Sequence, residues 1–187
     1  MKRAAVLFAD GFEEIEGLTI VDVLRRAGAG CDMIGLDALA VTGSHGVTVI
    51  ADRQLGDIDM EEITAEYDMI VLPGGLPGAE NLRDDRRVIR IIKSFAADPE
   101  KFIAAICAGP ISFGKAGVIS GRRVTSYPDP DVKAQLPDAV YVDDETVVSD
   151  GNIITSRGPA TALKFAYTLV NALGIENTGL EKKMLFR

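Results

Sequence analysis

The 187-residue sequence predicts an α/β sandwich with a mostly parallel central sheet and an added β-hairpin. Short apolar runs alternate along the chain with segments of helical periodicity, a pattern typical of parallel strands covered by helices. Apolar residues make up 47% of the chain, so disorder is not expected. No repeat or linker interrupts the pattern, and we expect one domain over residues 1–187.

The first half of the chain is expected to hold four strands and one long helix. The run AAVLFA (4–9) is typical of a buried strand. Residues 13–29 predict a helix, because Leu18, Val21 and Leu24 recur at three-residue steps before a glycine. Three further strands are predicted, at 31–37, 47–52 and 67–75, the last ending in a Pro-Gly-Gly turn.

The second half predicts further alternation. Residues 85–97 form an amphipathic pattern, and the apolar run 102–107 predicts the next strand. A short strand and a hairpin with Asp150-Gly151 as its turn are expected within 139–156. Two helices should follow, at 158–174 and 176–186.

Charge and cysteine content exclude several classes of partner. The net charge is −8, so nothing would neutralise the phosphates of a nucleic acid. No apolar run approaches the roughly 20 residues that span a bilayer, and we expect a cytoplasmic protein without a membrane partner. Two cysteines and one histidine at unrelated positions predict no disulfide and no metal site. The basic pairs are scattered: Arg25–Arg26, Arg86–Arg87 and Arg122–Arg123.

Three loops are expected to meet at one edge of the sheet. They follow predicted strands and comprise residues 10–16, 73–75 and 107–110. In an open parallel sheet, the carboxyl ends of the strands lie on the same edge, and ligands bind there. The loops would therefore bring a glutamate-rich segment, a Pro-Gly-Gly turn and a cysteine together.

Cys107 has the surroundings of a nucleophile. It lies between Ala105 and Gly109, small residues that a sharp strand-to-helix turn requires. Such a turn would hold the thiol near a helix N-terminus, which favours a thiolate. A buried structural cysteine remains the alternative. Gly74 and Gly75 would supply N–H groups for an oxyanion, or form an ordinary turn.

The glutamates of the first loop are the candidate proton carriers. Glu13, Glu14 and Glu16 lie at the start of a predicted helix, where surface glutamates are also common. If one of them faces Cys107, two like charges would meet, so one group should keep a proton. A protonated glutamate could then donate a hydrogen bond to the sulfur. His45 precedes a predicted strand and is expected to be a turn residue rather than a general base.

The ordered set GFEEIE, VLPGG, AAICAGP and TSRGP resembles the ThiJ/PfpI superfamily, in particular the branch of the Parkinson-associated protein deglycase and its bacterial relatives. The resemblance runs over essentially the whole chain. It implies a flavodoxin-like three-layer sandwich and a homodimer. It also implies a reactive, easily oxidised Cys107, a buried acid at Glu16, and an oxyanion pocket of Gly74, Gly75 and the amide of Ala108.

Departures from the family pattern narrow the implied activity. The peptidase branch has a histidine directly after the cysteine, where this chain has Ala108, so peptidase activity is not expected. Several nearer relatives carry a histidine where this chain has Tyr127, which predicts low turnover of small aldehydes. The position of His45 often holds arginine in relatives. Tyr127, His45 and Arg157 of the TSRGP motif are therefore possible pocket residues, with Glu13 and Glu14.

Two functional hypotheses lead, and Tyr127 leaves open a third, in which the fold is only a stable scaffold. The resemblance implies a cysteine-dependent, cofactor-free glyoxalase- or deglycase-like enzyme that acts on methylglyoxal, glyoxal or their early protein adducts. The alternative is a stress or chaperone protein that senses an oxidant through oxidation of Cys107, without substrate turnover. Ile20 and Val23 lie off the main apolar face of helix 13–29 and would suit packing against a twin subunit or under a loop.

Overall fold

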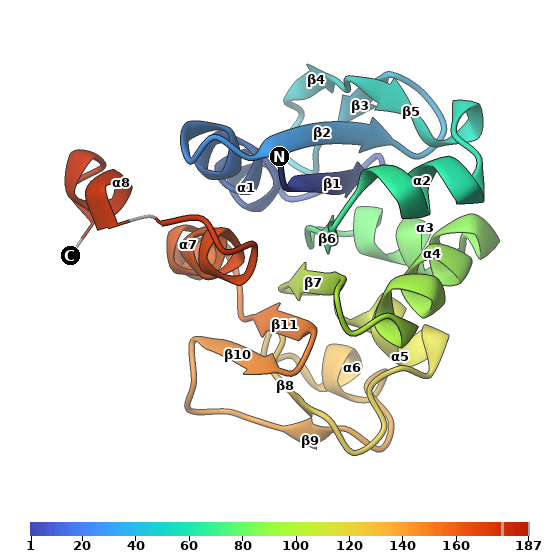
Figure 1. Cartoon of the computed structure of the whole chain (residues 1–187). Coiled ribbons are helices and arrows are strands. Elements are labelled where there is room, and N and C mark those ends of the chain that lie inside the picture. The colour runs from blue at the N-terminus through green and yellow to red at the C-terminus, as the bar shows by residue number, and fades with distance from the viewer. Residues whose placement is uncertain (177, 187) are drawn as a thin grey trace.

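The computed structural model describes residues 1–176 and 178–186 and has three layers (Figure 1). The strands of its central sheet are β1 (Arg3–Phe8), β2 (Gly30–Gly35), β5 (Arg53–Gln54), β6 (Met69–Leu72), β7 (Phe102–Ile106), β10 (Val147–Asp150) and β11 (Ile153–Ser156). They lie in the order β10-β11-β7-β6-β1-β2-β5. All neighbours are parallel except β10 and β11, which form the predicted antiparallel hairpin. The predicted flavodoxin-like sandwich is confirmed.

Helices cover both faces of the sheet. Figure 1 shows α1 (Glu14–Arg26) and α7 (Ala162–Ala172) on one face. The other face carries α2 (Met60–Glu66), α3 (Gly78–Asp84), α4 (Arg86–Ala97) and α5 (Ile111–Ala116). Two 3₁₀ turns, η1 (Leu55–Asp57) and η2 (Pro159–Thr161), precede α2 and α7. The short helices α6 (Pro130–Lys133) and α8 (Thr178–Lys183) lie outside these layers.

The apolar core consists of two clusters, one on each face of the sheet. Alternate side chains of β1 divide between them: Ala4, Val6 and Phe8 belong to the cluster that α1 and α7 also form, whereas Ala5 and Leu7 belong to the other. Because both faces of a central parallel strand are buried, its sequence is a continuous apolar run rather than an alternating one. This explains why the AAVLFA segment was recognisable as a strand.

Helix α1 carries Glu16 into the protein interior. Glu16, Ile20, Val23 and Leu24 recur at three- and four-residue spacing, and each is fully buried. Ile20 and Val23 therefore pack in the core of this chain, so of the two expectations for them, a twin subunit or a covering loop, contact with a twin subunit is wrong. The apolar side chain that α1 does expose is Ile15, which is 57% exposed.

The predicted strand 47–52 is present in part, but it does not belong to the central sheet. Its residues form β4 (Thr48–Ile50), which pairs antiparallel with β3 (Ala40–Thr42) in a separate two-stranded sheet. Gly46, with φ +84°, lies in the turn between these strands. Because β4 is mostly exposed, it lacks the two buried faces of a central strand.

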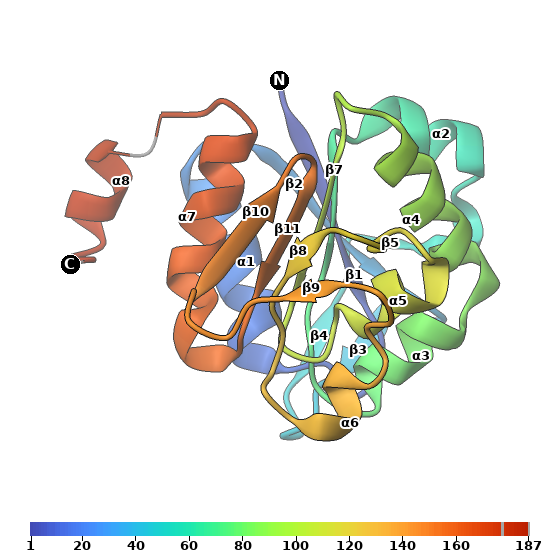
Figure 2. The ribbon, with the colours of Figure 1, turned by 90° about the horizontal axis from the view of Figure 1, so that it is seen from below.

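The region before α7 also differs from the predicted strand and hairpin within 139–156. The short strand expected near 139 is β9 (Val140–Tyr141), which pairs with β8 (Arg123–Val124) beside the β10–β11 hairpin (Figure 2). The hairpin turn consists of Gly151 and Asn152, one residue later than predicted, and Gly151 adopts φ +58°. Part of the predicted helix 176–186 is α8, but residue 177 lies outside the described residues. Where the chain is described, none of its helices is both long and apolar enough to cross a membrane.

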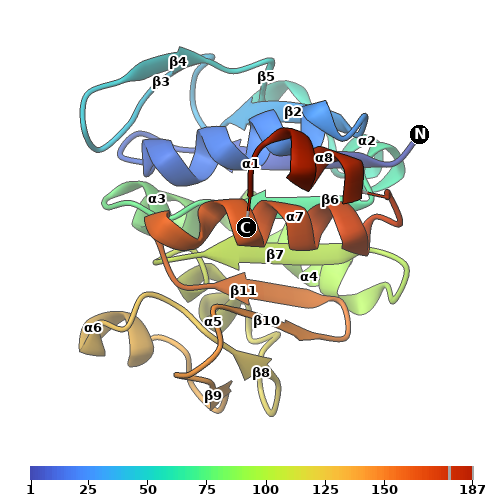
Figure 3. The same ribbon diagram turned by 90° about the vertical axis from the view of Figure 1, so that its left-hand side faces the viewer.

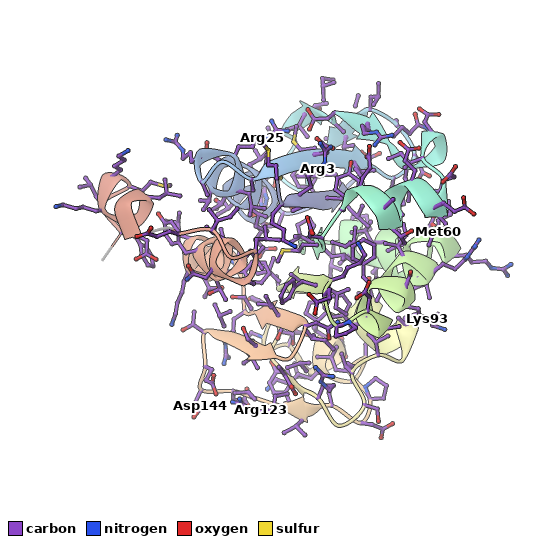
Figure 4. The ribbon with its side chains drawn as sticks, in the orientation of Figure 1. Arg3, Arg25, Met60, Lys93, Arg123 and Asp144 are labelled. Atoms are coloured by element: carbon purple, nitrogen blue, oxygen red, sulfur yellow. The ribbon has the colours of Figure 1, made fainter. Side chains whose placement is uncertain are left out.

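Arginine side chains are distributed around the fold. Figure 4 places Arg25 and Arg123 at opposite ends of the view, consistent with the scattered basic pairs in the sequence. Arg25 forms an ion pair with Asp52 at 2.5 Å, and Arg123 pairs with Glu145. Each of these two arginines therefore has its charge offset by a carboxylate.

Candidate active site

Cys107 lies in a sharp turn directly after β7. Its φ is +62°, a left-handed conformation that residues other than glycine rarely adopt. The Cys107 N–H donates to the carbonyl of Ser156 at 3.0 Å, and the Cys107 carbonyl accepts from the N–H of Tyr127 at 2.9 Å. These two bonds hold the strained backbone in place, as expected where strain is retained at a functional turn.

The turn requires glycine at neighbouring positions. A Cβ atom on Gly109 would lie 2.6 Å from the carbonyl oxygen of Leu72, and one on Gly74 would lie 2.6 Å from the Cβ of Cys107. Both distances are shorter than van der Waals contact, so a side chain at either position would displace the turn. Small residues around the cysteine thus have the structural reason that the sequence pattern predicted.

The helix after the cysteine begins later than expected. Helix α5 has six residues and starts at Ile111, so the Cys107 sulfur is not within the first turn of the helix. The backbone N–H groups that interact with the sulfur belong to Ala108 and Gly75. Two loop amides therefore take the place of the expected helix N-terminus.

Glu16 is fully buried beside Cys107. Its Oε2 accepts a hydrogen bond from the N–H of Gly74 at 2.8 Å, and its carboxyl group interacts with the Cys107 thiol. The other oxygen, Oε1, is buried without a partner of ordinary hydrogen-bond geometry. Because the Gly74 N–H is directed to Glu16, Gly74 positions the acid and does not serve as the oxyanion donor that the sequence suggested.

The Glu16 carboxyl group and the Cys107 thiol influence each other's protonation. Burial raises the pKa of Glu16 to about 7. Burial also raises the pKa of the Cys107 thiol, and the Glu16 carboxylate raises it further, whereas the N–H groups of Ala108 and Gly75 lower it. This direction is opposite to that expected of an activated thiol. The repulsion disappears when Glu16 holds a proton, so a thiolate at Cys107 requires a protonated Glu16.

A pocket of about 490 Å³ opens over Cys107. Gly75 and Ala108 line its floor with Cys107, and the half-exposed Tyr127 forms part of its wall. Figure 3 shows α6 and the β3–β4 hairpin at the side of the molecule toward which β7 points. The site therefore lies at the carboxyl ends of the strands, where the sequence placed it. Four acidic residues also line the pocket: Glu13, Glu80, Asp129 and Asp131.

Glu14 and His45 lie next to this pocket but do not line it. Glu14 accepts hydrogen bonds from the backbone N–H groups of His45 at 2.7 Å and Val47 at 3.3 Å, and its Oε2 lies 3.0 Å from Nδ1 of His45. Burial alone would raise the pKa of Glu14, but these partners lower it to about 2. His45 is exposed, and its pKa is raised first by Glu14 and then by Glu13. Glu14 thus fastens the β3–β4 turn to α1.

The sequence predicted no metal site, but one group of side chains has atoms close enough together to bind a metal ion. The ligand atoms of Glu13, Glu14 and His45 all lie within 4.8 Å of one another. Both oxygens of Glu14 already accept hydrogen bonds from the β3–β4 turn. A cation would therefore compete with the contacts that hold this turn.

Of the two remaining candidate pocket residues, Tyr127 and Arg157, only Tyr127 lines the pocket. Tyr127 is 48% exposed and lines the pocket, whereas Arg157 does not line it and donates to the backbone carbonyl of Asp143. Sequence reasoning missed the acidic residues on α3 and α6. The Asp-Pro-Asp segment could have revealed α6, because Asp129 accepts from the N–H of Asp131 at 2.8 Å as an N-cap, with Pro130 at the first helical position.

Comparison with known proteins finds relatives that match nearly the whole chain. The chain is 42% identical over 174 residues to protein dj-1beta of Drosophila melanogaster, covering 92% of this chain and 89% of that protein. The crystal structure of Drosophila melanogaster DJ-1beta superposes with a TM-score of 0.91 at 39% identity, covering 100% of this chain and 98% of that chain.

A second relative carries an activity in its name. The glutathione-independent glyoxalase DJ-1 of Schizosaccharomyces pombe is 32% identical over 176 residues, covering 91% of this chain and 90% of that protein. The model of the DJ-1/PfpI family matches residues 2–172, which include every part of the pocket described above. The resemblance recognised in the sequence is confirmed, and the chain belongs to the DJ-1/PfpI family.

Proposed function

We propose that this chain is a cysteine-dependent, cofactor-free enzyme of the glyoxalase or deglycase type, acting on α-dicarbonyls such as methylglyoxal and glyoxal or on their early protein adducts. The observation that carries the proposal is the pairing of Cys107 with a buried Glu16 at the floor of an open pocket. A nucleophile and a proton carrier with a raised pKa are the two groups that this chemistry needs. The name of the fission yeast relative supports the same reaction class.

The first step is addition of sulfur to carbon. With the proton on Glu16, the Cys107 thiolate attacks the aldehyde carbon of methylglyoxal and forms a C–S bond. The carbonyl electrons move to oxygen, and the N–H groups of Gly75 and Ala108 stabilise the resulting oxyanion. Glu16 then transfers its proton to that oxygen, which gives a neutral hemithioacetal and leaves Glu16 ionised.

The second step is an internal proton transfer. Ionised Glu16 removes the proton from the sulfur-bearing carbon, which gives an enediolate, and returns that proton to the neighbouring carbon. The hydroxyl proton on the former aldehyde oxygen passes to the former ketone oxygen, so the former aldehyde carbon becomes the carbonyl of a thioester. Water then attacks the thioester, the C–S bond breaks, and lactate and the Cys107 thiol are released. Carbon is oxidised at one position and reduced at the next, so the reaction consumes only water.

The direct test is lactate formation from methylglyoxal. We expect Cys107→Ser to lower kcat/KM at least about a thousandfold, because hydroxyl is a far weaker nucleophile at neutral pH. The matched control is Cys31→Ser, at the other cysteine of the chain. Absence of lactate above background with the unsubstituted protein at high concentration would remove the proposal.

The alternative, an oxidation sensor, is favoured by the same two amides. A sulfinate at Cys107 would place oxygen atoms where the N–H groups of Gly75 and Ala108 can bind them. We expect graded peroxide treatment to add two oxygen atoms at Cys107 and none at Cys31, as measured by intact mass and peptide mapping. Equal oxidation of both cysteines would contradict the sensor hypothesis.

We also propose a homodimer in the cytoplasm. The resemblance to the ThiJ/PfpI superfamily implies the homodimer. Both cysteines are free, in keeping with a reducing compartment. A second subunit would have to cover surface other than Ile20 and Val23, which this chain buries itself. The exposed Ile15 on α1 is one candidate for such a contact.

A further inference from the structure

The pocket over Cys107 has an unbalanced charge. Its lining includes four carboxylates, on Glu13, Glu80, Asp129 and Asp131, and within residues 1–176 and 178–186 no lysine, arginine or histidine lines it. These four residues are called the acidic rim below. They come from three separate parts of the chain, the start of α1, helix α3 and the α6 segment, so carboxylates from different elements converge on one pocket.

The nearest cations are largely committed elsewhere. Arg83 lies 3.8 Å from Glu80, but its guanidinium binds Asp84 at 2.7 Å and Gln135 at 2.7 Å. Nδ1 of His45 lies 3.6 Å from Glu13 and closer, at 3.0 Å, to Glu14. The acidic rim therefore keeps most of its negative charge.

The floor of the pocket does not offset this charge. Loss of one proton from the Cys107–Glu16 pair adds a further negative charge below the acidic rim. The pocket walls are formed by protein, which concentrates the field at the opening and changes the local concentration of charged solutes. A solute with a carboxylate is repelled as it approaches the sulfur, whereas a cationic one is attracted.

We propose that the acidic rim selects substrates by charge, admitting neutral and preferentially cationic carbonyl compounds to Cys107 and excluding carboxylate-bearing ones. The cationic class includes a dicarbonyl fragment attached to a guanidinium or ammonium group. This inference extends the proposed function by naming the charge class of its substrates. The four residues of the acidic rim are its specificity-determining residues, since they line the pocket without belonging to the reacting pair.

The test measures access to the sulfur without requiring turnover. Three methanethiosulfonates with an ethyl group ending in trimethylammonium, hydroxyl or sulfonate differ mainly in charge. In each case the Cys107 thiolate forms a mixed disulfide and displaces methanesulfinate. Rate constants at Cys107, followed by peptide mass mapping, are divided by those for N-acetylcysteine, which removes the intrinsic differences among the reagents.

We expect the normalised rate constants to favour the cationic reagent over the anionic one at least about tenfold at low ionic strength, and the ratio to fall with added salt. In the double variant Glu80→Gln/Asp131→Asn the ratio should fall at least about threefold. The matched control is Glu100→Gln. Glu100 is exposed and lies just before the first residue of β7, at the end of the strand away from Cys107, so this variant should leave the ratio unchanged.

Two results would overturn the inference: a ratio near one in the unsubstituted protein, or a ratio that the double variant and the Glu100 variant change equally. Failure of the proposed function gives a different result. If methylglyoxal yields no lactate while the charge ratio persists and depends on the acidic rim, the reaction is wrong but the selectivity stands. If lactate forms and the ratio is near one, the reaction stands and the selectivity is wrong.

Discussion

The two cysteines of this chain show how position in a sheet decides the chemistry of a side chain. Cys31 lies within β2 in extended backbone, opposite Ala4 of β1, and is 6% exposed among apolar side chains. Burial raises its pKa to about 12, although Arg25 opposes the shift. Cys107 lies one residue beyond the end of β7, in left-handed backbone at the floor of a pocket.

The comparison shows that burial alone does not distinguish a structural from a functional cysteine. Burial raises the pKa of both thiols. What differs is the partner: Cys107 has a buried acid that can hold a proton and two N–H groups near its sulfur, whereas Cys31 packs in an apolar cluster with the Arg25 guanidinium as its charged partner. A strand end supplies such partners because loops from several strands meet there.

The largest expected difference between the two cysteines is in alkylation by iodoacetamide. In the folded protein at pH 7.5, we expect Cys107 to react at least about a hundredfold faster than Cys31, because Cys31 reacts only after the sheet opens locally. Mass spectrometry of each cysteine-containing peptide over time measures both rates. In urea, where both are exposed, the rates should converge. Comparable rates in the folded state would show that the pocket gives the sulfur no advantage.

The next effect concerns the acid that only Cys107 possesses. Because the folded-state pKa of Glu16 is about 7 and its ordinary value is 4.5, the folded protein binds a proton that the unfolded chain releases between these values. The stability associated with that proton is fully present below pH 4.5 and is lost as the pH rises through about 7. Its size is about 3 kcal/mol, from a shift of roughly two and a half pKa units.

Glu16→Gln should remove this pH dependence. We expect the unfolding free energy of the unsubstituted protein to fall by about 3 kcal/mol between pH 5 and pH 8, relative to that of the variant. Urea titrations at a series of pH values give the measurement, with Glu100→Gln as an exposed-carboxylate control. Parallel curves for the unsubstituted protein and Glu16→Gln would mean that Glu16 ionises at its ordinary pKa.

A smaller loss is expected from crowding the turn that holds both groups. An alanine Cβ at Gly74 would lie 2.6 Å from Cys107 Cβ and 2.8 Å from Glu16 Oε2. We expect Gly74→Ala to cost about 2 kcal/mol of unfolding free energy and to slow Cys107 alkylation, because both partners must move. Gly179→Ala is the matched control, since nothing lies within 4 Å of a Cβ there. If the two variants unfold alike, the turn tolerates a side chain.

The difference between the buried interior of the sheet and the loops at its edge also explains what could be predicted from the sequence. Apolar patterns identified the central strands β1, β6 and β7 and the helices α1, α4 and α7, since these elements bury wide faces. Strand direction then placed three loops at one edge, and the Glu13 N–H donating to the Gly74 carbonyl at 2.9 Å confirms that two of them meet. Neither step required knowledge of side-chain contacts.

The parts that were missed depend on tertiary contacts. Helix α3 is short, and Gly78 packs so closely on the first loop that a Cβ would lie 2.6 Å from the N atom of Phe12. Helix α6 has four residues and little apolar periodicity. Glu80, Asp129 and Asp131 of the acidic rim lie on or directly before these two elements and therefore escaped notice, whereas Glu13 was already a candidate. The sharing of protons between Glu16 and Cys107 depends on burial, which spacing along the chain does not specify.

The smallest expected effect tests the structural half of the comparison. Cys31→Ala removes one sulfur atom from an apolar site that is 6% exposed, and its neighbours can relax only partly. We expect a loss of about 1 kcal/mol in unfolding free energy, measured by urea titration, and no change in the alkylation rate of Cys107. Cys31 lies on β2 and Cys107 directly after β7, and β6 and β1 separate these two strands, so the effects of the two cysteines should be independent. A change in Cys107 reactivity in this variant would mean that the core under β2 helps to set the geometry of the pocket, and that the two regions are coupled through the sheet.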